Sequence, residues 1–164
     1  MKHSQAVRRN MIINQNVFQT HKQLFRLSCI PMSVELVLKL LERVPPDYFE
    51  LQKPWDNKSF GSFADFSGKD LFGVKFEQKY ALPRDANFPL EGLFQTIENE
   101  LKLGNYVIIS LNVPGGWHMY VVYDQLPNGE FLAATKGQRK ELIDNVREIV
   151  ESMRGTDMLI CHAT

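Results

Sequence analysis

The sequence has few cysteines and no excess of charge of either sign, and each absence excludes a class of protein. Its two cysteines, Cys29 and Cys161, are too few for a structural zinc site or a disulfide framework. Lysine and arginine together number 19, as do aspartate and glutamate, so the formal net charge is zero. Because the basic residues are scattered, we expect no binding to nucleic acid or to an anionic membrane.

Long apolar runs are also absent. No stretch approaches the roughly 20 apolar residues that a membrane-spanning helix needs, and residues 1–10 are charged but not followed by the apolar segment of a signal peptide. We therefore expect a cytoplasmic, reducing setting without a Cys29–Cys161 disulfide, although export without a cleaved signal stays open. The sequence has no Gly-rich phosphate loop and no metal-ligand spacing among its histidines, so no cofactor or metal is predicted.

A chain of 164 residues fits one domain over 1–164, with residues 1–10 as a flexible arm. The pattern favours an α+β fold, with helices in the first half and an antiparallel sheet in the second. The expected elements are a short strand over 11–13 and 17–18, a helix from 28 or 29 to about 44, loops and short helical turns over 47–73, a strand over 74–80, a helix over 90–103, strands over 106–111, 117–123 and 130–134, a helix over 139–153, and a strand over 158–161.

The helix that opens near Cys29 is the most informative of these elements. Pro31 suits its first turn, where a missing N–H costs nothing, and Pro45 stops it. Nearly all positions in between are apolar, so we expect this helix to be buried on all sides. A cysteine at its N-terminus would have unpaired N–H groups nearby, and these favour a thiolate.

Three residue types in this chain could together perform nucleophilic catalysis. Cys29 would attack a carbonyl as the thiolate, and His118 would act as its base and later as an acid. The attack creates an oxyanion, which needs donors placed in advance. Gln23, six positions before Cys29, could supply one donor from its amide, and the backbone N–H of Cys29 could supply another.

These residues resemble the papain-like cysteine peptidases, in particular the compact bacterial branch similar to bacteriocin leader-processing peptidases. That branch shows an oxyanion Gln, five residues, and then Cys-Gly-Pro-Ala-Ser opening a buried helix, where this chain has Gln23 and Cys29-Ile30-Pro31-Met32-Ser33. A second block, 116–124, matches the family's Gly-His strand. The resemblance covers about residues 20–162. It implies a buried N-terminal helix packed on a small antiparallel sheet, and a peptide or protein substrate.

The sequence departs from the family at the third catalytic residue. An Asp or Asn is expected at the end of the hairpin strand after the histidine, and Thr135 stands there. A hydroxyl orients an imidazolium less well than a carboxylate does. Two functions therefore stay open. One is a thiol-dependent hydrolase, most simply a cysteine peptidase with a Cys–His dyad, with an acyltransferase or a deamidase as variants of the same covalent step. The other is a catalytically degenerate papain-like binding module.

Each residue also has a plainer interpretation. A cysteine is more often a buried, inert thiol than a nucleophile, and the assignment of Gln23 depends entirely on its spacing to Cys29. Trp117 and the aromatic residues of 47–73 could line a substrate groove, but we favour core packing for them. Cys161 and His162 are interpreted as structural, because neighbours on a strand point to opposite faces. The sequence indicates neither the substrate nor the oligomeric state.

Overall fold

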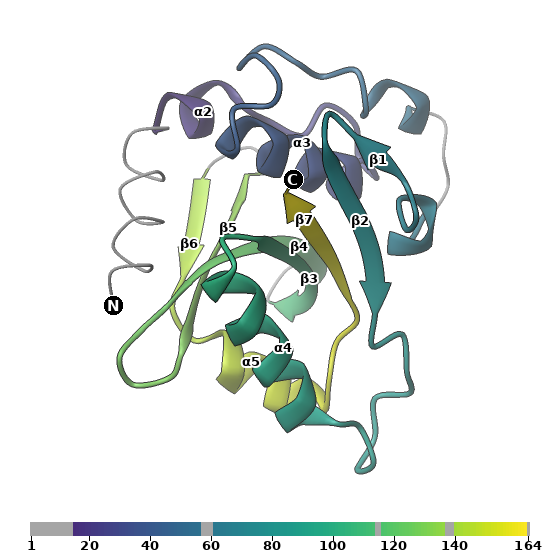
Figure 1. The fold of residues 1–164 in the computed structure, drawn as a ribbon. Helices are drawn as coiled ribbons and strands as arrows, with labels where there is room; N and C mark the ends of the chain where they lie inside the picture. Colours follow the sequence, from purple (N-terminus) through teal and green to yellow (C-terminus); the bar gives the residue numbers. More distant parts are fainter. Residues whose placement is uncertain (1–14, 57–60, 114–115, 137–139, 164) are drawn as a thin grey trace.

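The computed structural model describes residues 15–56, 61–113, 116–136 and 140–163. They form a mixed α+β fold around one sheet with the strand order β1-β2-β7-β3-β4-β5-β6, in which every neighbouring pair is antiparallel (Figure 1). The strands are β1 (Asp70–Leu71), β2 (Val74–Lys79), β3 (Tyr106–Val113), β4 (Gly116–Gln125), β5 (Phe131–Lys136), β6 (Lys140–Ile143) and β7 (Met158–Ala163).

Helices cover both faces of this sheet. The described α-helices are α2 (Gln15–Thr20), α3 (Cys29–Leu40), α4 (Leu90–Lys102) and α5 (Val146–Met153), and two 3-10 helices follow α3, η1 (Lys53–Trp55) and η2 (Phe63–Asp65). Alternate residues of each strand point to opposite faces. Ile108 and Val121 therefore pack with α3 on one face, while Ile109 and Val122 pack with α4 and α5 on the other. The expected α+β class is confirmed.

Helix α3 begins at Cys29 as predicted but ends at Leu40 rather than near 44. Its end is a Schellman motif, in which the N–H of Arg43 donates to Leu38 O and the N–H of Glu42 donates to Lys39 O. Glu42 takes the left-handed conformation that this motif needs, with a φ of 57°. Residues 30–40 are all buried, so the expectation of a helix covered on all sides is confirmed.

Two predictions were wrong: the strand over 17–18 and the start of the helix over 139–153. Both rested on a few apolar residues. Residues 17–18 belong to helix α2 and not to a strand, because Val17 reaches the α3-side core from a helical turn; residues 11–13 lie outside the described residues. The expected helix over 139–153 begins only at Val146. Residues 140–143 instead form edge strand β6, in which Leu142 is 53% exposed.

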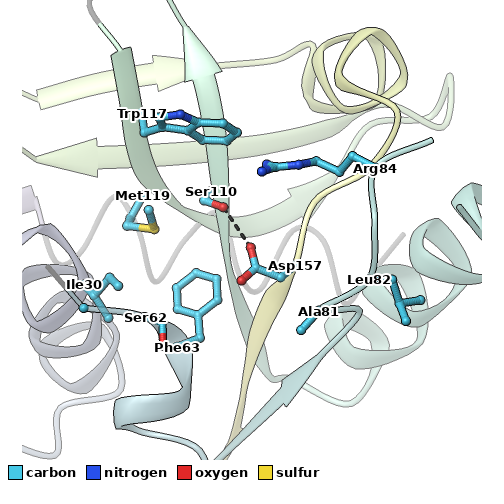
Figure 2. A pocket seen from close by; sticks show the side chains of 11 residues that line it. Ile30, Ser62, Phe63, Ala81, Leu82, Arg84, Ser110, Trp117, Met119 and Asp157 are labelled. Carbon is cyan, nitrogen blue, oxygen red and sulfur yellow. Dashed lines mark hydrogen bonds between the residues drawn. The ribbon is translucent and has the colours of Figure 1, made fainter.

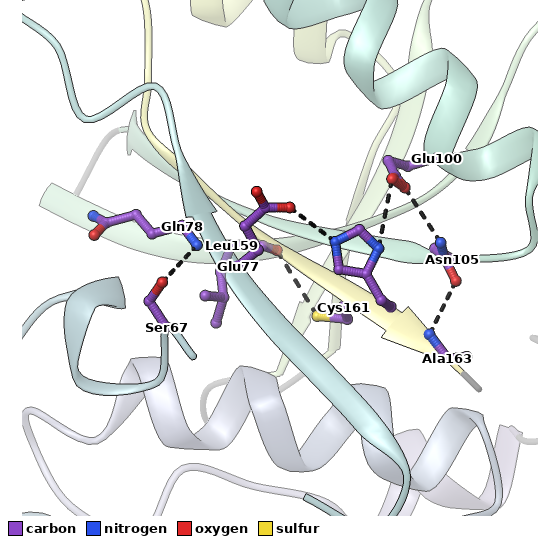
Figure 3. A network of polar contacts seen from close by, with 9 residues as sticks. Ser67, Glu77, Gln78, Glu100, Asn105, Leu159, Cys161 and Ala163 are labelled. Carbon is purple, nitrogen blue, oxygen red and sulfur yellow. Dashed lines mark hydrogen bonds and ion pairs between the residues drawn. The ribbon is translucent and has the colours of Figure 1, made fainter. Parts of the chain in front are cut away.

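Strand β7 is central to the sheet, lying between β2 and β3, although its sequence suggested only a closing strand. Its Cys161 is fully buried, while His162 lies on the other side of the strand with Nε2 3.0 Å from Glu77 Oε1 and Nδ1 3.7 Å from Glu100 Oε1 (Figure 3). The two side chains therefore act separately, as strand alternation predicts.

Polar side chains on the buried helix α3 are paired with the irregular segments beside it. Glu35 accepts hydrogen bonds from the N–H of Leu51 at 3.0 Å and from Gln52 Nε2 at 2.6 Å. Gln52 Oε1 in turn accepts from the N–H of Leu24 at 2.7 Å and from Ser28 Oγ at 2.8 Å. Gln52 thus ties the segment before α3 and the segment after it to the same helix.

A second buried contact lies one turn further along α3. Lys39 Nζ is 2.8 Å from His21 Nδ1 and 3.8 Å from the centre of the Phe49 ring, and His21 Nε2 is 2.8 Å from Met32 O. Burial lowers the pKa of Lys39 to about 8, and the carboxylate of Glu35 partly opposes that shift. These contacts fix the chain around α3, and with it the position of Cys29.

We expect Gln52→Ala to destabilise the protein by about 2–4 kcal/mol, because the buried N–H of Leu24 and the carboxylate of Glu35 lose their partner. The matched control is Gln95→Ala on the exposed face of α4, with an expected change within about 0.5 kcal/mol. Urea unfolding of the two variants measures both. Equal midpoints for the two variants would contradict a structural role for Gln52.

Candidate functional site

Cys29 is the first residue of α3, and its side chain is partly buried against the α3-side core. Burial raises the pKa of its thiol, while hydrogen bonding to the backbone N–H groups of Cys29 and Ile30 acts in the opposite direction. Burial is the larger of these effects. The N–H groups at the helix N-terminus therefore favour the thiolate as predicted, but burial outweighs them and the pKa of the thiol stays raised.

His118 lies on the other face of the sheet. It is directly paired with Leu111, which is buried under α4 and α5, and it shares its face of β4 with Tyr120. Its neighbour Met119 pairs with Ser110 and belongs to the α3 side. The structure therefore does not bring the imidazole of His118 together with the thiol of Cys29, and the catalytic roles of both residues stay predictions.

Of the other two predicted residues, Gln23 hydrogen-bonds within its own segment and Thr135 lies on the opposite face of the sheet from the thiol. Gln23 Nε2 donates to Phe25 O at 2.8 Å and to Arg26 O at 2.9 Å, so both amide protons are used within its own turn. Thr135 is buried in β5, where alternation with Ala134 on the α3 side puts it on the face of His118. The structure thus groups His118 with Thr135 by face, apart from Cys29.

A groove of about 370 Å³ lies at the first turn of α3, on the sheet face that α3 covers (Figure 2). It runs between η2, the loop after β2, and the strands β3 and β4. Ile30 lines the groove, and Ile30 directly follows Cys29 in the chain. The residues that line it are Ile30, Gly61, Ser62, Phe63, Ala81, Leu82, Arg84, Ser110, Trp117, Met119 and Asp157.

Besides Ser62, three polar side chains line this groove: Arg84, Ser110 and Asp157. Ser110 Oγ donates to Asp157 Oδ1 at 2.9 Å, and Thr156 Oγ1 donates to Ser110 O at 2.7 Å, which fixes the segment before β7 against β3. The guanidinium of Arg84 lies over the ring of Trp117, 4.4 Å from its centre. Figure 2 shows this guanidinium and the Asp157 carboxylate on the same side of the groove.

Sequence reasoning missed most of this groove. Core packing was favoured for Trp117, which instead lines the groove and is 47% exposed, and no role was predicted for Arg84, Ser110 or Asp157. Arg84 lies in a loop without periodicity, and Asp157 precedes a strand whose central position was not foreseen. The one available signal was the polar Ser110 within the apolar run 106–111, because a buried strand face rarely carries a hydroxyl without a partner.

Comparisons with protein families, with curated proteins and with solved structures gave no match to this chain. Within the described residues, no helix is long and apolar enough to cross a membrane. The same residues contain no cluster of three or more His, Cys, Asp or Glu side chains that could hold a metal ion.

The two cysteines should differ sharply in reactivity. Iodoacetamide should label Cys29 in the native protein and leave Cys161 unmodified, because Cys161 is fully buried and its pKa is raised by that burial. Peptide mapping by mass spectrometry measures the two sites, and labelling in urea provides the control in which both react. Equal native labelling would contradict the placement of Cys161 at the centre of the sheet.

Proposed function

We propose that this chain is a papain-like binding module that holds a peptide-like ligand in the groove at the first turn of α3. The proposal is based on the identity of the strand β4 side chains that line the groove. Trp117 and Met119 line it, while His118, between them, is on the opposite face. A ligand in this groove would meet an indole and a thioether where a peptidase would present an imidazole.

The surroundings of Cys29 support binding over cleavage. A thiol nucleophile needs a lowered pKa, whereas burial raises that of Cys29. An oxyanion donor must be available to the substrate, whereas Gln23 donates to two carbonyls of its own turn. These contacts, together with the opposite face of His118, support binding more than cleavage.

The groove has the composition of a recognition surface. Leu82 and Trp117 are about half exposed at its rim, while Phe63 and Met119 are buried in its wall. Exposed large apolar side chains around a concavity mark binding sites, and tryptophan is especially frequent where binding energy concentrates. Apolar walls with a few convergent polar groups are typical of sites for small ligands and peptides.

A thiol-dependent hydrolase, most simply a cysteine peptidase, is the second candidate. One observation favours it: Cys29 opens α3, is partly exposed, and is followed by Ile30 on the groove wall. A one-residue change in the register of β4 would turn His118 to the α3 face, because strand side chains alternate. An acyltransferase or a deamidase would use the same covalent step.

Alkylation of Cys29 across pH separates these two candidates. If the chain is a binding module, we expect the alkylation rate to reach half its maximum at a pH above roughly 8.5, the pKa of a free thiol. The reason is that burial raises the pKa of Cys29. His118→Ala should not move that midpoint, and Gln23→Ala serves as a control with the same expectation. A midpoint well below that of a free thiol that rises in His118→Ala would instead establish the hydrolase candidate.

Binding itself is testable through the indole of Trp117. In Trp55→Phe, Trp117 is the only tryptophan, and we expect a mixture of short peptides to change its fluorescence. The matched control is Trp117→Phe, in which the buried Trp55 remains and no change is expected. If the mixture changes neither variant's emission, the proposed peptide-binding groove is wrong.

A further inference from the structure

The charges on the groove point to a more specific ligand. We infer that the groove selects molecules with both a free amino group and a free carboxylate, namely amino acids or dipeptides, with the carboxylate at Arg84 and the amino group at Asp157. This inference depends on the proposed function, because it names the ligand of the same groove. Its evidence is the arrangement of one cationic and one anionic side chain around an apolar wall.

Arg84 provides the anion-binding end. Its guanidinium stacks over Trp117 with 4.4 Å between the charge centre and the ring centre. A guanidinium that lies over a ring keeps N–H groups for a carboxylate, which they match in a bidentate geometry. Among the described residues, no carboxylate lies within ion-pair distance of Arg84, so its donors stay available to a ligand.

Asp157 provides the cation-binding end. Its Oδ1 accepts from Ser110 Oγ at 2.9 Å, which fixes the carboxylate while leaving further acceptor sites on both oxygens. No lysine, arginine or histidine among the described residues forms an ion pair with it. Thr156 Oγ1 donates its single proton to Ser110 O at 2.7 Å and also lies 2.9 Å from Asp157 O, which holds the backbone at this point.

The apolar wall and the volume limit the ligand's size. Ile30, Phe63 and Met119 offer an apolar surface for a side chain. A cavity of about 370 Å³ is near the lower end of the 300–1,000 Å³ usual for small-molecule sites. An amino acid or a dipeptide fits this range.

Other ligand classes match the groove less well. An internal segment of a polypeptide has no charged ends, so its backbone would cover Arg84 and Asp157 without pairing their charges, which is costly. A phosphate-rich ligand such as a nucleotide would be repelled by the Asp157 carboxylate. A zwitterion is the class that satisfies both side chains at once.

The test compares one dipeptide, phenylalanyl-leucine, in four forms by isothermal titration calorimetry: free, N-acetylated, C-amidated and doubly blocked. Each single block should weaken binding to the wild-type protein by about 10- to 100-fold, because each removes one charge-assisted contact. In Arg84→Gln, the free and amidated forms should bind equally. In Asp157→Asn, which retains an acceptor for Ser110 Oγ, the free and acetylated forms should bind equally.

Matched controls are Arg26→Gln and Asp144→Asn, which neutralise exposed charges that do not line the groove and should keep the full preference for the free dipeptide. Thermal melts report whether each variant is folded, and the four-form comparison on the wild type needs no variant. If the doubly blocked form binds as tightly as the free form, this inference is overturned and the groove proposal stands. If no form binds and the peptide mixture leaves Trp117 unchanged, the proposed function is overturned with it.

Discussion

The hydrogen bonds between Gln52 and the chain on both sides of α3 are the constraint on which the rest of the structure depends. A helix buried on all sides must find partners for any polar side chain that it carries. Glu35 finds them in Gln52 and the N–H of Leu51, and Lys39 finds one in His21. These contacts fix two segments that have no sheet to hold them, and they set where the first turn of α3 lies. The groove forms at that turn, between the helix and the strands that it covers.

Which side chains of β4 face α3 determines what the groove can do. Pairing of Ser110 with Met119 and of Leu111 with His118 assigns alternate residues of β4 to opposite sides. An apolar residue therefore faces the helix that carries the thiol, and the imidazole faces away. Binding needs complementary surface and charge, and apolar side chains line this groove together with Arg84 and Asp157. Catalysis would need a thiolate and a base in contact. That contact depends on which face of the sheet the odd- and even-numbered residues of β4 take.

Much of the fold could be predicted from the sequence, and the failures have physical causes. Helix α4 was predicted almost to its ends because its apolar residues repeat with helical spacing and Gly104 follows it. The start of α3 was predicted from Cys29 and Pro31. Residues 140–143 were wrongly joined to α5, because Leu142 and Ile143 continue its apolar spacing, although Asn145 is a typical residue to precede a helix. Pairing with β5 decided that segment, and pairing is not visible in a local pattern.

The sequence by itself determined the α+β class, the buried helix that begins at Cys29, and the chain order of an amide, a thiol and an imidazole at Gln23, Cys29 and His118. These follow from local composition and spacing, which act over a few residues. Only the tertiary structure decided which face His118 takes, that Gln23 bonds to its own turn, and that Arg84 and Asp157 meet at one groove. Strand register and loop placement arise from contacts between segments far apart in the chain, so the side chains that share a site are fixed only when those segments pack together.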